Sequence, residues 1–275
     1  MRVSSRRRVT NRLNKRNRIL HAEINNEDET PFEKGKRIVK AAYDDGVTLR
    51  LIGGLAVRFH CHGPHSSHLR AYNDIDLFGL NKELRRIYSV FQKLGYSPND
   101  KYNVFYGETR LQFIDQKSAG HVDIFLDKFI MDHTLDFRRR LQLDKMTIPI
   151  TDLLLTKLQI VRLSAKDTTD IIAILEDHEI GLVNGQETLN VEYIAELCSS
   201  NWGLHKTVTD NLLKMTEIIE ERSLEPFEKK DLVSKLEAIQ NIVKIKKKTL
   251  RWRLRSVIGE RVRWYQEIES GEGEI

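Results

Sequence analysis

Hydrophobic and polar residues recur along this chain with two different periods. Residues 32–45 place apolar side chains three to four positions apart, which predicts a helix. Leu49 to Ile52 is a short, largely apolar run that ends at a glycine pair, and it predicts a strand. Asp74 to Phe78 and His121 to Leu126 alternate polar with apolar residues, which predicts two further strands. The first half of the chain therefore mixes helices with strands.

The remaining pattern divides the chain. A helix is predicted over 82–94, and a pair of strands at 103–106 and 110–114. From Thr151 onward, helical spacing dominates. We therefore predict an α+β protein with a mixed sheet and a mostly helical C-terminal domain. Its predicted parts are a basic, disordered leader (1–30), a mixed unit (31–150) and a helical unit (151–275).

Charge is concentrated at two places. The 275 residues carry 45 Lys and Arg against 40 Asp and Glu, a net charge of +5. Residues 1–20 contain eight basic side chains and no acid, and residues 244–263 contain nine with one acid, so the remaining chain is acidic. Basic ends on an acidic body suit contact with a polyanion, although tails and exposed helix faces are also often basic.

Cysteine usage and hydropathy bear on the compartment. Two cysteines, Cys61 and Cys198, exclude a disulfide framework and fit a reducing compartment. No apolar run is long enough for a membrane-spanning helix, and the basic N-terminus lacks the apolar segment of a signal peptide. We therefore expect a soluble, cytoplasmic protein that makes no membrane contact.

Three aspartates carry the candidate chemistry. Asp74 and Asp76 point to the same side of one predicted strand, because alternate residues of a strand share a face. Asp123 lies on a separate predicted strand, and the three acids converge if the two strands are neighbours. Mg²⁺ prefers such oxygen ligands when it must also bind phosphate. A solvated strand face is the alternative interpretation.

A glycine pair precedes these aspartates. Gly53 and Gly54 follow an apolar strand, and a helix is predicted to start at Leu55. Glycine lets the backbone approach a ligand closely, and the amides of a helix N-terminus can bind phosphate. A plain turn between strand and helix would have the same sequence. The informative feature is the order: a glycine pair, then Asp-x-Asp, then a lone Asp on a later strand.

This order resembles the nucleotidyltransferase superfamily that is built on the palm of DNA polymerase beta. The matching residues are Gly53, Gly54, Asp74, Asp76 and Asp123. The resemblance implies a nucleotidyltransferase palm in which the three aspartates are catalytic and hold Mg²⁺. It also implies that the glycine pair binds the nucleotide.

A second block is similar to one in the AbiEii-like toxin nucleotidyltransferases. The block consists of Lys157, Arg162, Lys166–Asp167 and Asp170. On one helix, Lys157 and Arg162 would lie on different faces, so geometry alone does not direct the lysine to a phosphate. The resemblance implies that Lys157 faces the nucleotide phosphates and that Asp167 lies near the active centre.

Two positions before the Asp-x-Asp strand bear on the same resemblance. Arg70, four residues before Asp74, matches an arginine of the toxin-like members and is implied to bind nucleotide. Tyr72 stands where those members usually carry a small hydroxyl residue. This departure puts the preference for acceptor or base in doubt.

A histidine-rich segment separates the glycine pair from the aspartates. Its five potential metal ligands are His60, Cys61, His62, His65 and His68. Zinc binds His and Cys, but this spacing matches no standard zinc finger and no second ligand pair follows it. The sequence favours a polar loop beside the active site.

The C-terminal region combines an apolar stripe with a basic segment. The stripe from Leu232 to Val243 predicts a helix that packs on the core. Trp252 follows among six basic residues: Lys246, Lys247, Lys248, Arg251, Arg253 and Arg255. Such a mixture can bind a nucleic-acid backbone and stack on a base. A basic helix face that Trp252 anchors to the core is the other interpretation.

The sequence therefore predicts a Mg²⁺-dependent nucleotidyltransferase that moves a nucleoside monophosphate from an NTP, such as ATP, to an acceptor. The predicted acceptor is RNA or tRNA, or a protein. The resemblance to toxin nucleotidyltransferases also implies an antitoxin partner. A small-molecule acceptor, as in antibiotic nucleotidyltransferases, is the main alternative. An inactive palm that binds RNA or protein is the third, and the intact Asp74, Asp76 and Asp123 argue against it.

Overall fold

The structure is a computed structural model that describes residues 29–62, 71–185 and 187–267. The first part of the fold combines helices with a five-stranded sheet and a two-stranded hairpin. Its elements are α2 (Pro31–Asp44), β1 (Leu49–Ile52), α3 (Gly53–His60), β2 (Ile75–Gly79), η2 (Asn81–Glu83), α4 (Leu84–Lys93), β3 (Tyr96–Pro98), α5 (Asp100–Tyr106), β4 (Arg110–Asp115), β5 (His121–Leu126), β6 (Lys128–Ile130) and β7 (Thr134–Asp136).

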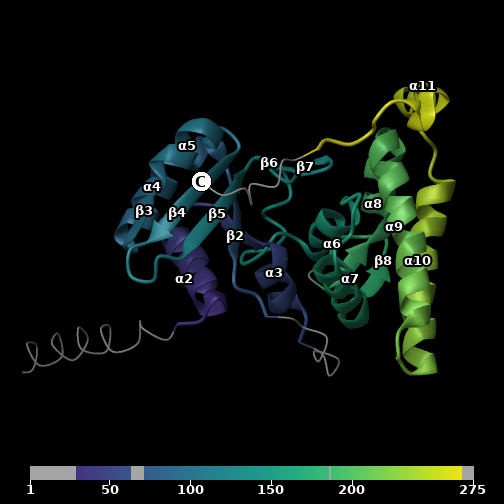
Figure 1. Cartoon of the computed structure of the whole chain (residues 1–275), viewed down its shortest axis with the longest axis horizontal. Helices are drawn as coiled ribbons and strands as arrows, with labels where there is room; N and C mark the ends of the chain where they lie inside the picture. Colours follow the sequence, from purple (N-terminus) through teal and green to yellow (C-terminus); the bar gives the residue numbers. More distant parts are fainter. Residues whose placement is uncertain (1–28, 63–70, 186, 268–275) are drawn as a thin grey trace, which may run out of the picture.

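The second part is mostly helical. Its elements are α6 (Ile150–Leu158), α7 (Ala165–Asp177), β8 (Glu179–Gly181), β9 (Thr188–Asn190), α8 (Val191–Ser200), α9 (Trp202–Glu221), α10 (Pro226–Ile245), α11 (Leu250–Ile258) and η3 (Gly259–Arg261). Figure 1 shows the five-stranded sheet on one side of the molecule and the long helices α9 and α10 on the other. The predicted α+β class, with a mixed sheet and a helical C-terminal part, is confirmed.

The five-stranded sheet has the order β1-β2-β5-β4-β3. β2 and β5 are parallel, and the other neighbouring pairs are antiparallel. The sheet is therefore mixed, and its two central strands are the two that carry Asp-x-Asp and the lone Asp. Because these strands run parallel, their N-terminal ends lie at the same edge of the sheet.

Local signals explain how α2 begins and which face it buries. The Thr30 side chain accepts a hydrogen bond of 3.3 Å from the Glu33 amide, as an N-cap does. Ile38, Val39 and Ala42 recur at helical spacing and are buried. This face packs on β1 and β2.

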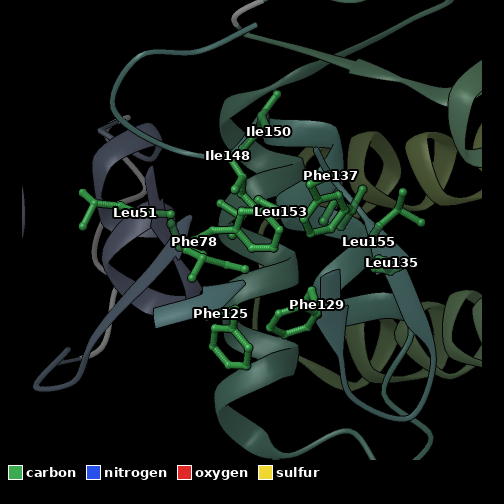
Figure 2. Close-up of a cluster of buried hydrophobic side chains, with 14 of the residues drawn as sticks. Leu51, Phe78, Phe125, Phe129, Leu135, Phe137, Ile148, Ile150, Leu153 and Leu155 are labelled. Atoms are coloured by element: carbon green, nitrogen blue, oxygen red, sulfur yellow. The ribbon is translucent and has the colours of Figure 1, made fainter. Parts of the chain in front are cut away.

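The hydrophobic core is continuous between the sheet and α6. Figure 2 shows Phe78 of β2 close to Leu153 of α6, and Phe125 of β5 beside Phe129. The rings of Phe78 and Phe137 are 5.5 Å apart, and all these side chains are buried. Full burial of one such side chain stabilises the fold by about 1.5–3 kcal/mol. This contact fixes the position of α6 relative to the sheet, and the candidate site depends on that position.

One predicted element is wrong. Residues 103–106 belong to the helix α5 and not to a strand. Asn99 caps this helix by accepting a hydrogen bond of 3.3 Å from the Tyr102 amide, and the Asn103 side chain binds the backbone of Gln112. Val104 and Phe105 are 81% exposed, so the apolar run that indicated a strand is not part of the core.

The apolar stripe of α10 is buried as predicted, at Leu232, Leu236, Ile239 and Val243. Cys61 and Cys198 are free and buried. No helix in the described part of the chain has the length and apolar character needed to cross a membrane. The predicted leader lies outside the described residues, apart from its last two.

Candidate active site

The pairing of β2 with β5 brings two of the predicted acids together. In this parallel ladder Asp76 is the register partner of Asp123. Asp74 lies two residues before Asp76, immediately ahead of β2, and its side chain is exposed. Among the described residues, the three aspartates form a neighbouring pair with an exposed third acid and not a closed three-ligand cluster.

Burial is the main cause that raises the pKa of Asp76 to about 6, and the nearby Asp123 carboxylate acts in the same direction. Arg110 and Lys157 act in the opposite direction. Asp123 itself is buried, with Arg110 Nε 3.4 Å and Gln112 Nε2 3.3 Å from its Oδ1 atom. Two carboxylates held this close in a partly dry site repel each other, and a bound cation relieves that repulsion.

Gly53 forms the turn beside Asp76. Its φ is +66°, a left-handed conformation that favours glycine. A Cβ atom at this position would lie 2.8 Å from Asp76 Oδ2, closer than real Cβ contacts allow. The next residue, Gly54, continues the first turn of α3, where backbone amides have no partner within the helix. The glycine pair therefore keeps open the space between the helix N-terminus and the aspartates.

Lys157 reaches the same space from α6. Its Nζ atom lies 3.1 Å from Asp167 Oδ1 and 2.8 Å from Asp170 Oδ2. Burial acts to lower the pKa of Lys157, but Asp170 and Asp167 outweigh it and raise the pKa. The ammonium is therefore charged at neutral pH, and the two acids of α7 fix its direction.

A cavity of about 230 Å³ connects these groups. It is lined by Ile52, Gly53, Asp76, Arg110, Phe125, Phe129, Met131, Thr156, Lys157, Ile160 and Asp167. Residues from the sheet, from α6 and from α7 thus share one cavity. Its lining combines the carboxylates of Asp76 and Asp167, the basic groups of Arg110 and Lys157, and the rings of Phe125 and Phe129.

Three residues that support the site were not predicted as site residues from the sequence. Arg110 and Gln112 alternate along β4, so both point toward Asp123 on the neighbouring strand. The Tyr72 hydroxyl donates a hydrogen bond of 3.0 Å to Asp170 Oδ1 and so supports the acid that holds Lys157. The alternation of Arg110 and Gln112 was visible in the sequence, but the Tyr72 contact joins distant segments and had no local signal.

Two predicted residues are not placed in the site. Arg162 is exposed in the connection between α6 and α7, because α6 ends at Leu158. The Val161 amide instead donates a hydrogen bond of 2.6 Å to Asp132 Oδ2. The assumption that Lys157 and Arg162 share one helix is therefore wrong. Arg70 lies outside the described residues.

The basic C-terminal segment is partly used within the protein. Lys246 pairs with Glu192 and Glu196, the Lys248 amine donates to the Val243 carbonyl, and Arg255 donates to Gly259 and Val262. Lys247, Arg251 and Arg253 are exposed. Trp252 packs edge-on to His205, with ring centroids 5.1 Å apart, and lines a cavity of about 600 Å³ together with Arg251.

Comparisons with known proteins add little to this geometry. No family model matches the chain, and no curated protein matches it significantly. A solved structure of the antibiotic-resistance factor ANT(2'')-Ia is similar, with 12% identity and a TM-score of 0.32 over 50% of this chain and 78% of that one. A likeness at this level decides neither fold nor activity, so function has to be argued from the site.

Proposed function

We propose that this protein is a Mg²⁺-dependent nucleotidyltransferase that transfers a nucleoside monophosphate from an NTP to an acceptor hydroxyl. The observation that carries the proposal is the parallel register of β2 and β5, which sets Asp76 beside Asp123. The glycine turn and the charged Lys157 in the same cavity support it, since phosphates need both close backbone amides and positive charge.

Each group then has a role. Asp76 and Asp123 hold Mg²⁺, and the exposed Asp74 completes the ligand set. Bound Mg²⁺ supplies charge neutralisation for the phosphates and the departing pyrophosphate. Gly53 and Gly54 present amides to the triphosphate, Lys157 binds its oxygens, and Asp167 orients Lys157. Asp123 also helps to activate the acceptor hydroxyl, whose oxygen attacks the α-phosphorus as the bond to pyrophosphate breaks.

An assay with NTPs labelled at the α-phosphate tests this directly. The protein is incubated with each NTP, Mg²⁺ and total cellular RNA, and the position of the label is determined. Label on RNA, on protein or on an added aminoglycoside identifies the acceptor class. If no label is transferred from any NTP to any of these acceptors in the presence of Mg²⁺, the protein is better explained as an inactive palm that binds RNA or protein.

We propose RNA as the acceptor, on the evidence of the exposed basic residues around Trp252. Of these residues, Arg251 lines a cavity of about 600 Å³ together with Trp252, and single-stranded nucleic acids bind such combinations of aromatic and basic groups. The finer assignment to the toxin-like group rests on the block of Lys157, Asp167 and Asp170, whose side chains form one ion-paired unit. An antitoxin partner belongs to that finer assignment.

RNA binding should weaken with salt, with a log–log slope of about −0.7 for each phosphate contact. Changing Lys247, Arg251 and Arg253 to Gln should flatten the slope by about two units, because these three side chains are exposed. Lys246, Lys248 and Arg255 are unsuitable targets, since they bind other parts of the protein.

The measurement is RNA affinity at several salt concentrations. A control variant with Gln at Lys214 and Lys230, exposed lysines of α9 and α10, should keep the wild-type slope. Equal slopes for all three proteins would show that the basic segment does not bind RNA, and would favour a protein or small-molecule acceptor.

Tyr72→Phe should mainly impair nucleotide binding. The substitution keeps the ring buried but removes the hydrogen bond to Asp170, which costs about 1 kcal/mol of the free energy of unfolding. With Asp170 less firmly held, Lys157 loses its fixed direction, so the KM for NTP should rise by more than kcat falls. Steady-state kinetics at several NTP concentrations measure both constants.

Tyr193→Phe is the matched control. Tyr193 also interacts with a buried aspartate, Asp152, which pairs with Arg140, and none of these three lines the candidate site. It should lose similar stability and keep its KM. If Tyr72→Phe loses stability with no change in KM, Tyr72 supports only the fold.

A further inference from the structure

A second cluster of metal-ligating side chains lies away from the aspartates. His60 is the last residue of α3, His178 follows the end of α7, and Glu187 precedes β9. One ligand atom from each lies within 4.8 Å of the other two. Both imidazoles are buried, whereas the Glu187 side chain is 66% exposed. The cluster is therefore built into the fold and remains accessible from solvent.

The hydrogen bonds of His178 place its Nε2 atom opposite an acceptor with no donor between them. Nδ1 lies 3.0 Å from the Ile174 carbonyl, which can only accept, so this nitrogen carries a proton. In the neutral ring Nε2 then has a lone pair, yet it faces Glu187 Oε2 at 2.8 Å. Two acceptors at this distance require a cation: an added proton or a metal ion.

His60 has a related arrangement. Its Nε2 atom lies 2.6 Å from Thr147 Oγ1, a hydroxyl that is able to accept the ring proton. Its Nδ1 atom is buried and has no hydrogen-bond partner among the described residues, and it lies 3.8 Å from Glu187 Oε1. Metal-bound histidines commonly donate their other N–H to a carbonyl or hydroxyl in this way.

The two buried rings are close enough to share one ion. Their centroids are only 5.8 Å apart. Neutral imidazole is the form that binds metal, and one ion can bind a nitrogen of each ring together with the Glu187 carboxylate.

We propose that His60, His178 and Glu187 bind one Zn²⁺ ion, with water at the fourth position. Two imidazole nitrogens and one carboxylate oxygen suit zinc, with bonds of about 2.0–2.2 Å. The three ligand atoms lie within 4.8 Å of one another, so one ion between them can reach all three after side-chain shifts, and the exposed Glu187 has room to move. The ion joins the C-terminal end of α3 to α7 and to the segment before β9.

This site is independent of the proposed transferase activity and differs from the proposed Mg²⁺ site in both residues and chemistry. Hard oxygen ligands from aspartates suit Mg²⁺, whereas imidazole selects borderline metals such as zinc. His60 belongs to the histidine-rich segment, which no second ligand pair follows in the sequence. The fold supplies that pair from His178 and Glu187, which lie far along the chain.

The test uses the full-length protein, stripped with a chelator and titrated with Zn²⁺ alone. We expect one equivalent to bind, and the midpoint temperature of thermal unfolding to rise because zinc stabilises only the folded state. Co²⁺ in place of zinc should show the visible absorption of a four-coordinate site. Glu187→Ala, which changes an exposed side chain, should weaken zinc binding at least tenfold, and His178→Gln should weaken it further.

His133→Gln is the matched control. His133 is also buried and lies 2.8 Å from a threonine hydroxyl, that of Thr207, but it is not part of the cluster. It should bind one equivalent as the wild type does. The proposal is overturned if the stripped wild-type protein binds no zinc. It is also overturned if Glu187→Ala and His178→Gln bind zinc as tightly as the control. Loss of zinc binding in Asp76→Asn but not in these two variants would overturn it as well.

Discussion

Asp76→Asn should lower nucleotidyl transfer at least about a hundredfold, which corresponds to roughly 2.7 kcal/mol of transition-state stabilisation. Asp76 lies against Gly53 and is the register partner of Asp123. Its negative charge therefore contributes directly to binding a cation at this site. Asparagine has nearly the same shape, which separates the loss of charge from a change in packing. The measurement is the initial rate of label transfer from the best NTP at saturating Mg²⁺.

The same variant should be more stable than the wild type when metal is removed. Because the pKa of folded Asp76 is raised to about 6, the ionised carboxylate destabilises the fold. The sign follows: this destabilisation is fully present above about pH 6, declines as the pH falls toward the ordinary aspartate value near 4, and is absent below it. At pH 7.5 in EDTA the gain should be on the order of 1–3 kcal/mol, and at pH 3.5 it should vanish.

Asp136→Asn is the control for both readouts. Asp136 lies in β7, is exposed and pairs with Arg138 outside the candidate site. It should keep full activity and gain no stability at pH 7.5. An Asp76→Asn variant that keeps more than about a tenth of the wild-type rate, a difference under roughly 1.4 kcal/mol, would contradict the proposed metal site.

Local patterns predicted the elements that carry the site more accurately than they predicted the site itself. β1 and β5 have the predicted boundaries, because each combines buried positions with a clear turn signal at one end. The adjacency of β2 and β5 is a non-local property, and only the resemblance to a known family suggested it. Residues 103–106 show the limit of periodicity, since their apolar side chains form an exposed part of a helix.

The contacts that position the site were also beyond the reach of local patterns. Tyr72 and Asp170 are 98 positions apart in the chain, and their hydrogen bond depends on how α7 packs against the segment before β2. Lys157 was predicted by resemblance, but its two carboxylate partners required the end of α6 and the start of α7 to be placed. Sequence spacing can suggest which residues carry chemistry, whereas packing decides which of them meet.

The glycine turn gives the second large expected effect, and this effect centres on Gly53. Gly53→Ala should reduce transfer at least tenfold, or roughly 1.4 kcal/mol, because the new methyl group would lie against Asp76 Oδ2. It should also lower the free energy of unfolding by about 1–2 kcal/mol, since alanine is strained at a φ of +66°. Activity and urea unfolding are measured on the same preparation.

Gly95→Ala separates these two effects. Gly95 has a φ of +85°, but a Cβ atom there would meet nothing within 4 Å. This variant therefore carries the backbone strain without the contact to a carboxylate, and should lose similar stability while keeping its activity. If both variants lose stability and both keep their activity and NTP affinity, the turn at Gly53 serves the fold alone. If only Gly53→Ala loses NTP binding, the close approach of backbone, carboxylate and phosphate is what the glycine provides.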